Sequence, residues 1–374
     1  MKQALELFLD HFGKLEDNRE QPKVLHSVSE ILLVTLCGVI SGADGWEDIE
    51  EYGESKLKFL CHILPFKNGI PSDDTLRRFF RALNPEVFRE VFVGFMRELF
   101  PAAGAGRVAI DGKTSRRSHD GAQKALHLVS AFATEARVVL AQVATAEKSN
   151  EITAIPELLR LLDLRGTTIS IDAMGCQREI SKQIIDGGGD YLLGLKGNQG
   201  SLHNDVKLFF EQPPQGEQSI VSYEEYDKGH GRIEHRKCEA TSAINWLQKE
   251  HNWHGLQTII RITATRTIKE KTAVEARYYI SSLTADAKLI LENTRSHWAI
   301  ENSLHFVLDM SFGEDQSRIR KDNAPLAMAV IRHLALNFLQ QAKEKYKRMS
   351  IKRLRKLAGW DNKTLENILM IKSI

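Results

Sequence analysis

The first hundred residues have the apolar spacing of helices. An i, i+3, i+4, i+7 stripe, typical of an amphipathic helix, is formed by Leu76, Phe79, Phe80 and Leu83. Ser72 precedes this stripe as a cap, and Asn84 followed by Pro85 is the start signal of a second helix. We therefore predict an N-terminal all-helical domain over residues 1–100.

From residue 107 the pattern changes to short apolar runs of the strand type. We predict three consecutive strands and then an alternation of helix and strand, at 107–111, 126–134, 137–144, 152–162, 167–172, 177–185, 191–196 and 201–210. This order is that of a ribonuclease-H-like α/β core with a mixed sheet. Asp111 ends the first of its strands, and Asp172 ends the fourth.

The alternation stops at residue 212, and four further strands are predicted at 220–226, 232–241, 258–267 and 276–283. Helices return at 286–310 and 323–341. The prediction is an inserted β-domain that divides the catalytic core. The expected domains are 1–100, 101–211 for the first part of the core, 212–283 for the insert, 284–345 for the second part, and 346–374 for a basic C-terminal tail.

Composition changes this picture little, because 374 residues with 42% hydrophobic content and a net charge of +2 suit a globular protein of two or three domains. The charge is uneven, however: residues 342–374 contain ten lysines or arginines and three acids. This segment is either a contact for a polyanion or a solvated helix face.

Cysteine use and the N-terminus indicate a cytoplasmic protein. The four cysteines form no Cys-x-x-Cys pair, which disfavours a zinc ribbon or a disulfide framework. Residues 1–10 lack the apolar region of a signal peptide, and the apolar stretch 31–40 is too short to cross a bilayer. We expect no membrane partner.

Three acidic residues carry the candidate chemistry. Asp111 and Asp172 end apolar strands, and Glu301 lies in the helix predicted at 286–310. Three such oxygen ligands can hold two Mg²⁺ ions about 3.5 to 4 Å apart, the arrangement used in phosphodiester chemistry. Each acid also has an ordinary structural interpretation, as a turn residue, a helix cap and a solvated helix acid respectively.

Two histidines, His297 and His305, lie four residues before and after Glu301. This spacing admits a zinc site, but the His-Glu-x-x-His pattern of zinc proteases is absent, and carboxylate ligands suit Mg²⁺ better. A pair of core or solvated histidines and a pair of protonated phosphate contacts are the other two interpretations.

The chain also resembles a known family in five motifs: IDGKTSRRS at 110–118, KSNEI at 148–152, IDAMGCQ at 171–177, GDYLLGLKGNQ at 189–199 and HWAIENSLHFVLD at 297–309. These are similar to the bacterial insertion-sequence DDE transposases, and among them to the H-repeat-associated proteins of rearrangement-hot-spot elements. The resemblance extends over almost the whole chain.

The resemblance implies Mg²⁺-dependent DNA strand cleavage and strand transfer at the ends of an insertion sequence. Asp111, Asp172 and Glu301 match the family's catalytic triad and would bind two Mg²⁺ ions, with Mn²⁺ as an alternative. The implied partners are double-stranded DNA, as terminal inverted repeats and target, and a second copy of the chain on that DNA. Inside a bacterial cell the protein would then be nucleoid-associated.

Basic residues near the motifs and on the first helix of the pair are the candidate DNA contacts: Arg77, Arg78, Arg81, Lys113, Arg116, Arg117, Lys196, His297, His305, Arg318 and Arg320. The helix pair that carries Arg77 either enters a DNA groove or is a plain bundle with a solvated arginine face.

One departure from the wider superfamily concerns the tyrosine, arginine and lysine that many relatives have around the glutamate. Thr294, His297 and Leu308 occupy those places here, so His297, His305 or Arg295 would have to act instead. Two other functions stay open: a DNA-binding derivative without activity, and a stand-alone ribonuclease-H-like nuclease.

Overall fold

The computed structural model describes residues 3–17, 19–20, 24–120, 124–145, 151–213, 220–229, 231–269 and 271–371. The chain divides into two compact units. The first comprises Met1–Gly104, Gly112–Asn150 and Glu301–Ile374, and the second comprises Ala105–Asp111 and Glu151–Ile300. Lys148 to Asn150 of the second motif lie outside the described residues. The boundary between the units therefore passes through the strand of Asp111 and immediately before Glu301.

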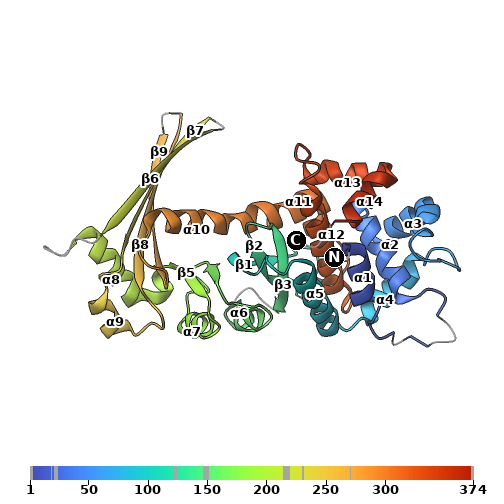
Figure 1. The fold of residues 1–374 in the computed structure, drawn as a ribbon, viewed down its shortest axis with the longest axis horizontal. Helices are drawn as coiled ribbons and strands as arrows, with labels where there is room; N and C mark the ends of the chain where they lie inside the picture. Colours follow the sequence, from blue (N-terminus) through green and yellow to red (C-terminus); the bar gives the residue numbers. More distant parts are fainter. Residues whose placement is uncertain are drawn as a thin grey trace. The chain divides into compact units, whose positions relative to one another are not determined.

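The first unit is mainly helical (Figure 1). Its elements are α1 (Ala4–Phe12), α2 (Val28–Ser41), α3 (Trp46–Leu60), α4 (Asp73–Ala82), α5 (Pro85–Leu99), β2 (His127–Ala133), β3 (Val138–Thr145), α11 (Phe306–Phe312), α12 (Ala324–Ala342), α13 (Ile351–Trp360) and α14 (Asn362–Leu369). Strands β2 and β3 form an antiparallel hairpin with a register shift between Ala131 and Phe132.

The predicted N-terminal helix pair is confirmed as α4 and α5. The Ser72 hydroxyl accepts the Thr75 N–H at 3.3 Å, and the Asn84 side chain accepts the N–H groups of Glu86 and Val87. These side chains satisfy backbone donors that the first turn of a helix leaves unpaired. The caps read from the sequence therefore begin both helices.

Helix α12 forms the centre of the first unit and is buried along nearly its whole length. Asn337 joins it to the hairpin, because its side chain accepts the Val139 N–H at 2.9 Å and donates to the Val139 carbonyl at 3.0 Å. On the helical side, the Phe338 ring stacks on Phe95 of α5 with centroids 6.2 Å apart. One helix thus packs against both the strands and the N-terminal helices.

The segment expected as a basic tail contains α13 and α14. Leu354, Leu365 and Ile368 from these helices are fully buried. Arg355 is also buried, and its guanidinium donates to the Val39 carbonyl of α2. Much of the basic segment is thus part of the packed first unit, and the exposed cations Lys352, Arg353 and Lys356 lie on the surface of α13.

The second unit is a mixed sheet with helices. Its elements are β1 (Gly106–Thr114), whose last three residues belong to the first unit, α6 (Glu151–Arg160), β4 (Thr167–Ile171), α7 (Arg178–Asp186), β5 (Asp190–Leu195), α8 (Gly200–Glu211), β6 (Val221–Gly229), β7 (Arg232–Thr241), α9 (Asn245–His251), β8 (Thr258–Ile268), β9 (Lys271–Ser281) and α10 (Ala287–Ala299). In this unit α10 lies on one side of β4 and β5, and α6 and α7 lie on the other (Figure 1). The predicted mixed α/β fold is confirmed.

Strand order in this unit is β1-β4-β5-β9-β8-β7-β6. The first three strands are parallel, and β9 joins β5 in the antiparallel direction, with Leu193 opposite Ile280. The four strands of the predicted insert therefore continue the sheet of the core. Helix α9 was not predicted, because seven residues are too few to establish a 3.6-residue period.

Among the described residues, none of the helices is by itself both long and apolar enough to cross a membrane. Taken together, α2 and α3 meet the length and composition, but they are bent by 97°.

His333 is a buried histidine of α12, and its Nδ1 has no hydrogen-bond partner among the described residues. Burial lowers the pKa of His333 to about 3, and the nearby charges of Arg332 and Lys113 act in the same direction. The folded protein therefore keeps this ring neutral at pH values where the unfolded chain protonates it.

We predict that His333 contributes to acid sensitivity. Below pH 6.5 the unfolded chain binds a proton that the folded chain does not, so the free energy of unfolding falls until about pH 3. His333→Gln should remove about 3 kcal/mol of the loss between pH 7 and pH 4. Urea denaturation at both pH values measures this difference, with the exposed His119→Gln as the control. Equal losses in wild type and His333→Gln would contradict the prediction.

Candidate active site

Asp111 and Asp172 lie where the pairing of two neighbouring parallel strands ends. Asp172 directly follows β4, whereas β1 continues past Asp111 to Thr114, so the prediction that this strand stops at Asp111 was wrong. The last paired residues of β1 and β4 are Ile110 and Ile171, and each aspartate is the next residue of its chain. Neighbouring strands are about 4.8 Å apart, so the two aspartates lie close to each other where β4 ends. Lys196 follows β5, the third parallel strand, and is exposed.

The Asp172 carboxylate is held by its own turn. Its Oδ1 accepts the N–H groups of Met174 at 3.0 Å and Gly175 at 3.4 Å. Its Oδ2 makes no hydrogen bond with any residue that the structure describes, and the side chain is exposed. One oxygen is therefore fixed and the other is accessible, which fits a carboxylate that binds a hard cation.

His297 connects α10 to the Asp172 strand. Its Nδ1 is 3.0 Å from the Ser170 hydroxyl of β4, two residues before Asp172. Burial lowers the pKa of His297, and the negative charge of Asp172 only partly opposes this. The ring is therefore neutral at neutral pH, so it acts as a hydrogen-bonding group and not as a cation.

Glu301 follows His297 by four residues and is exposed. The single helix predicted at 286–310 is found as α10, a π-helical turn at Ile300–His305 and α11. A π-turn interrupts the 3.6-residue period and occurs often at functional sites. The spacing of four between Glu301 and His305 therefore does not by itself place them on one face, as a zinc pair would require.

Lys113 of the first motif is surrounded by carboxylates. Its Nζ lies 2.7 Å from Asp309, 3.1 Å from Glu314 and 3.4 Å from Asp315. Only 12% of the Lys113 side chain is exposed, and only 2% of the Glu314 side chain. This ammonium group is thus an internal ion-pair partner for the residues that follow the Glu301 turn.

Attraction to the surrounding carboxylates keeps the Lys113 ammonium group charged. Burial alone lowers the pKa of Lys113, but attraction to Glu314 and Asp309 outweighs it and leaves that pKa above its ordinary value. Burial raises the pKa of Asp309, and Lys113 opposes that rise. Buried Arg332 is also attracted to Glu314, although its own burial lowers its pKa. Buried Lys113 and Arg332 therefore stabilise the negative charges of this cluster.

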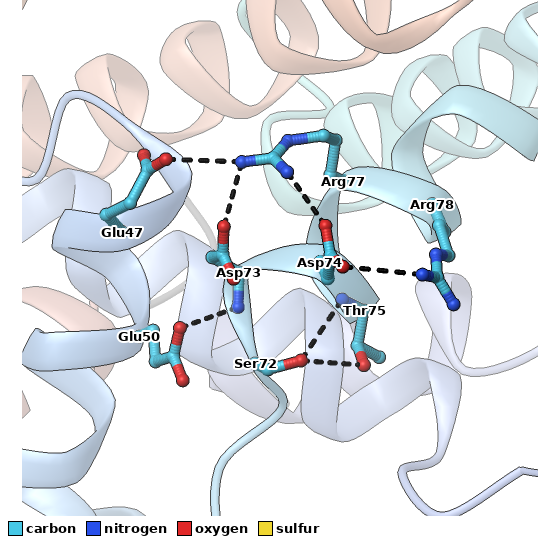
Figure 2. Close-up of polar contacts among 8 residues, drawn as sticks. All are labelled: Glu47, Glu50, Ser72, Asp73, Asp74, Thr75, Arg77 and Arg78. Carbon is cyan, nitrogen blue, oxygen red and sulfur yellow. Dashed lines mark hydrogen bonds and ion pairs between the residues drawn. The ribbon is translucent and has the colours of Figure 1, made fainter.

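The arginines of α4 are paired with nearby acids. Figure 2 shows the Arg77 guanidinium between Glu47 of α3 and the aspartates Asp73 and Asp74 of its own helix, at 3.2, 2.8 and 2.8 Å. Arg78 pairs with Asp74 at 3.3 Å and is 79% exposed. The exposed face expected from the sequence is present, but its charge is partly neutralised.

The other candidate contacts of the first unit gather around two segments, 115–120 and 317–322. Arg116 is exposed and pairs with Asp315 at 3.3 Å. Arg117 is exposed, and its carbonyl accepts the Arg320 Nε–H at 2.8 Å. Arg318 is exposed, whereas His305 is partly buried. Their contact with DNA stays a prediction.

A separate group, Asp205, Glu250 and His251, has ligand atoms within 4.8 Å of one another in the second unit. His251 Nε2 lies 2.7 Å from Asp205. These residues belong to α8 and α9, so this group is distinct from the predicted triad. The hydrogen bond between its members accounts for the arrangement.

Sequence reasoning missed Ser170, Lys321 and the acids around Lys113. A lone serine or aspartate has no sequence signal that identifies a distant partner. Lys321 does have a sequence signal, because it extends the basic run of Arg318 and Arg320.

Comparison with known proteins decides the family. The family described as Transposase DDE domain matches residues 102–338, and the one described as DDE_Tnp_1-associated matches residues 9–96. The chain belongs to the DDE transposase family. It is therefore a DNA transposase with a mixed α/β fold, and its family acts on DNA and uses divalent metal ions.

Two relatives agree with this assignment. The chain is 40% identical to "H repeat-associated putative transposase YhhI" of Escherichia coli K12, over 98% of both proteins. It is 41% identical to "Putative transposase YncI" of Escherichia coli O157:H7, over 98% of this chain and 95% of the relative. A solved piggyBac transposase synaptic complex with hairpin DNA aligns over 99% of this chain and 85% of that chain, with 10% identity and a TM-score of 0.46.

We predict that Lys113 is needed for stability. Lys113→Met leaves Glu314 buried beside other acids without its ion-pair partner, so the free energy of unfolding should fall by about 3 to 5 kcal/mol. Urea denaturation measures the change. Adding Glu314→Gln should restore part of the loss, because the buried charge is then removed as well.

The matched control is Lys182→Met, which breaks an exposed i, i+4 pair with Asp186. Exposed pairs contribute little, so this variant should unfold like the wild type. Equal stability of Lys113→Met and Lys182→Met would show that the Lys113 cluster is not a buried ion-pair network.

Proposed function

We propose that this transposase cuts DNA at the ends of an insertion sequence and joins the 3′ ends to target DNA, with Asp111, Asp172 and Glu301 holding two Mg²⁺ ions. Bound there, the ions would activate the attacking water or 3′-hydroxyl and stabilise the leaving 3′ oxygen. The observation that carries the proposal is the parallel pairing that ends at Ile110 and Ile171, after which each chain segment continues with an aspartate.

Two further observations support Glu301 as the third ligand. His297 is hydrogen-bonded to Ser170, so the end of α10 packs against the strand that leads to Asp172. Glu301 comes four residues later, in the π-turn that continues this helix. Carboxylates from three separate elements are the oxygen ligands that Mg²⁺ prefers.

Each protein residue has a defined task in this proposal. The backbone amides of Met174 and Gly175 orient Asp172, and neutral His297 holds α10 on β4 without adding a positive charge beside the metal ligands. Exposed Lys196, at the end of β5, would contact a DNA phosphate near the cleavage position.

Two copies of the chain would act together on DNA, because strand transfer joins two element ends to one target. The substrates would be the terminal inverted repeats and chromosomal target DNA in the bacterial nucleoid. Strand transfer also separates this function from its alternatives, since a stand-alone nuclease cuts without joining and an inactive derivative only binds.

We predict that Asp111→Asn, Asp172→Asn and Glu301→Gln each lower DNA nicking and joining by more than 100-fold, because each removes a metal ligand. Folding and DNA binding should be retained, since Asp172 and Glu301 are exposed and none of the three changes removes packing. Assays with end DNA and supercoiled target measure both steps.

The control for Glu301 is Glu292→Gln, which changes an exposed glutamate on α10 and should keep full activity. A triad variant that retained more than about a hundredth of wild-type cleavage would exclude that residue from the mechanism. Cleavage without joining by the wild type would favour the nuclease.

We predict that Mg²⁺ or Mn²⁺ supports cleavage and that Ca²⁺ supports DNA binding with little cleavage, because Ca²⁺ takes looser and higher coordination. Titration calorimetry should show Mn²⁺ binding to the wild type and weaker binding to Asp172→Asn. Activity that survived Mg²⁺ chelation and followed zinc would instead point to His297 and His305.

A further inference from the structure

A pocket of the first unit brings together basic residues that are far apart in the sequence. It has a volume of about 280 Å³ and is lined from α4 by Arg77 and Arg81, from the start of α3 by Glu47, and from a later segment by Arg318, Ile319, Arg320 and Lys321. A water molecule occupies roughly 30 Å³, so the pocket has room for a phosphate group and its hydration. Five cations and two acids, Asp44 and Glu47, line it.

The later segment brings two arginines to the pocket. Ile319 is buried between exposed Arg318 and partly exposed Arg320, and all three residues line the pocket. Buried Ile319 anchors the segment between the two arginines. Arg320 is fixed by its Nε–H, which donates to the Arg117 carbonyl at 2.8 Å.

The charges in this pocket are not equally available. Arg77 is held by three acids (Figure 2), Arg81 pairs with Asp322 at 2.5 Å, and Lys321 pairs with Asp120 at 3.0 Å. Among the residues that the structure describes, Arg318 has no ion pair or hydrogen bond, and Arg320 bonds only to a neutral carbonyl. Two guanidinium charges are therefore left without a counter-ion at one pocket.

Asp322 is placed to limit the positive charge. Its backbone has a positive φ of 50°, a conformation in which aspartate is tolerated better than most residues, and this residue directs its carboxylate to Arg81. Removing that carboxylate charge would free a third guanidinium beside Arg318 and Arg320.

We propose that this pocket binds backbone phosphates of duplex DNA through Arg318 and Arg320, and that Asp322 weakens this binding by neutralising Arg81. Guanidinium groups match phosphate oxygens in a two-pronged geometry and cannot lose their charge. The proposal rests on the proposed function, since it supplies the DNA contact for that chemistry. It also joins the arginines of α4 and those after the Glu301 helix into one site.

The test is binding of the full chain to a labelled duplex with Ca²⁺ at several salt concentrations. Each phosphate contact contributes about 0.9 to the slope of log affinity against log salt, so Arg318→Ala and Arg320→Ala should each flatten the slope by about that amount. The loss should be the same on element-end DNA and on random DNA, because phosphates are common to both. Asp322→Asn should act in the opposite direction, with tighter binding and a steeper slope.

Two controls separate this site from general effects. Arg160→Ala removes an exposed arginine of α6 that has no ion pair among the described residues, and it should leave the slope unchanged. Arg318→Lys keeps the charge but loses the two-pronged geometry, so it should keep the slope with weaker binding. Thermal melting of each variant confirms that it is folded.

An unchanged slope in Arg318→Ala and Arg320→Ala, or a loss confined to one DNA sequence, would overturn the proposal. Weaker binding of Asp322→Asn would also overturn it. The binding assay with Ca²⁺ does not depend on cleavage. If the triad variants kept their activity, the binding results for Arg318, Arg320 and Asp322 would still stand or fall on their own.

Discussion

The parallel pairing of β1 with β4 is the constraint on which the proposed chemistry depends. Its register ends at Ile110 and Ile171, and both chains continue with an aspartate. A shift of one residue would move each side chain to the opposite face of the sheet. Val108, Ile110 and Ile169 are buried in the core on these two strands, and their packing holds the register. The catalytic prediction thus depends on ordinary core packing.

Charge burial plays the second structural role. Lys113, two residues after Asp111, is enclosed by acids that follow the Glu301 turn, and Arg332 lies buried beside the same group. Burying a charge costs free energy unless an opposite charge compensates. Removing one member of this cluster should therefore destabilise the folded protein. At the surface this cost is small. Arg318 and Arg320 need no acidic partner, because water solvates them. Burial therefore distinguishes the two kinds of cation: buried Lys113 has a structural role, and exposed Arg318 is available to bind a ligand.

Most secondary structure could be predicted from the sequence. The caps at Ser72 and Asn84 and the strand that ends just before Asp172 agree with the structure, because these signals are local. Local signals failed elsewhere. Strand β1 continues past Asp111 to Thr114. Helix α9 is too short to show a period, and the π-turn at Ile300–His305 has no hydrophobic pattern that distinguishes it from an α-helix.

The sequence by itself determined the order of elements, the family motifs and the acidic residues proposed for the metal site, since each depends on neighbouring residues or on residue type. Only the tertiary structure decided which basic side chains are available to a ligand. Lys113 and Arg318 are both cations near a motif, yet one is enclosed by three carboxylates and the other has no ion pair among the described residues. The reason is physical: the counter-ions of Lys113 come from positions about two hundred residues away, and only folding brings them into contact.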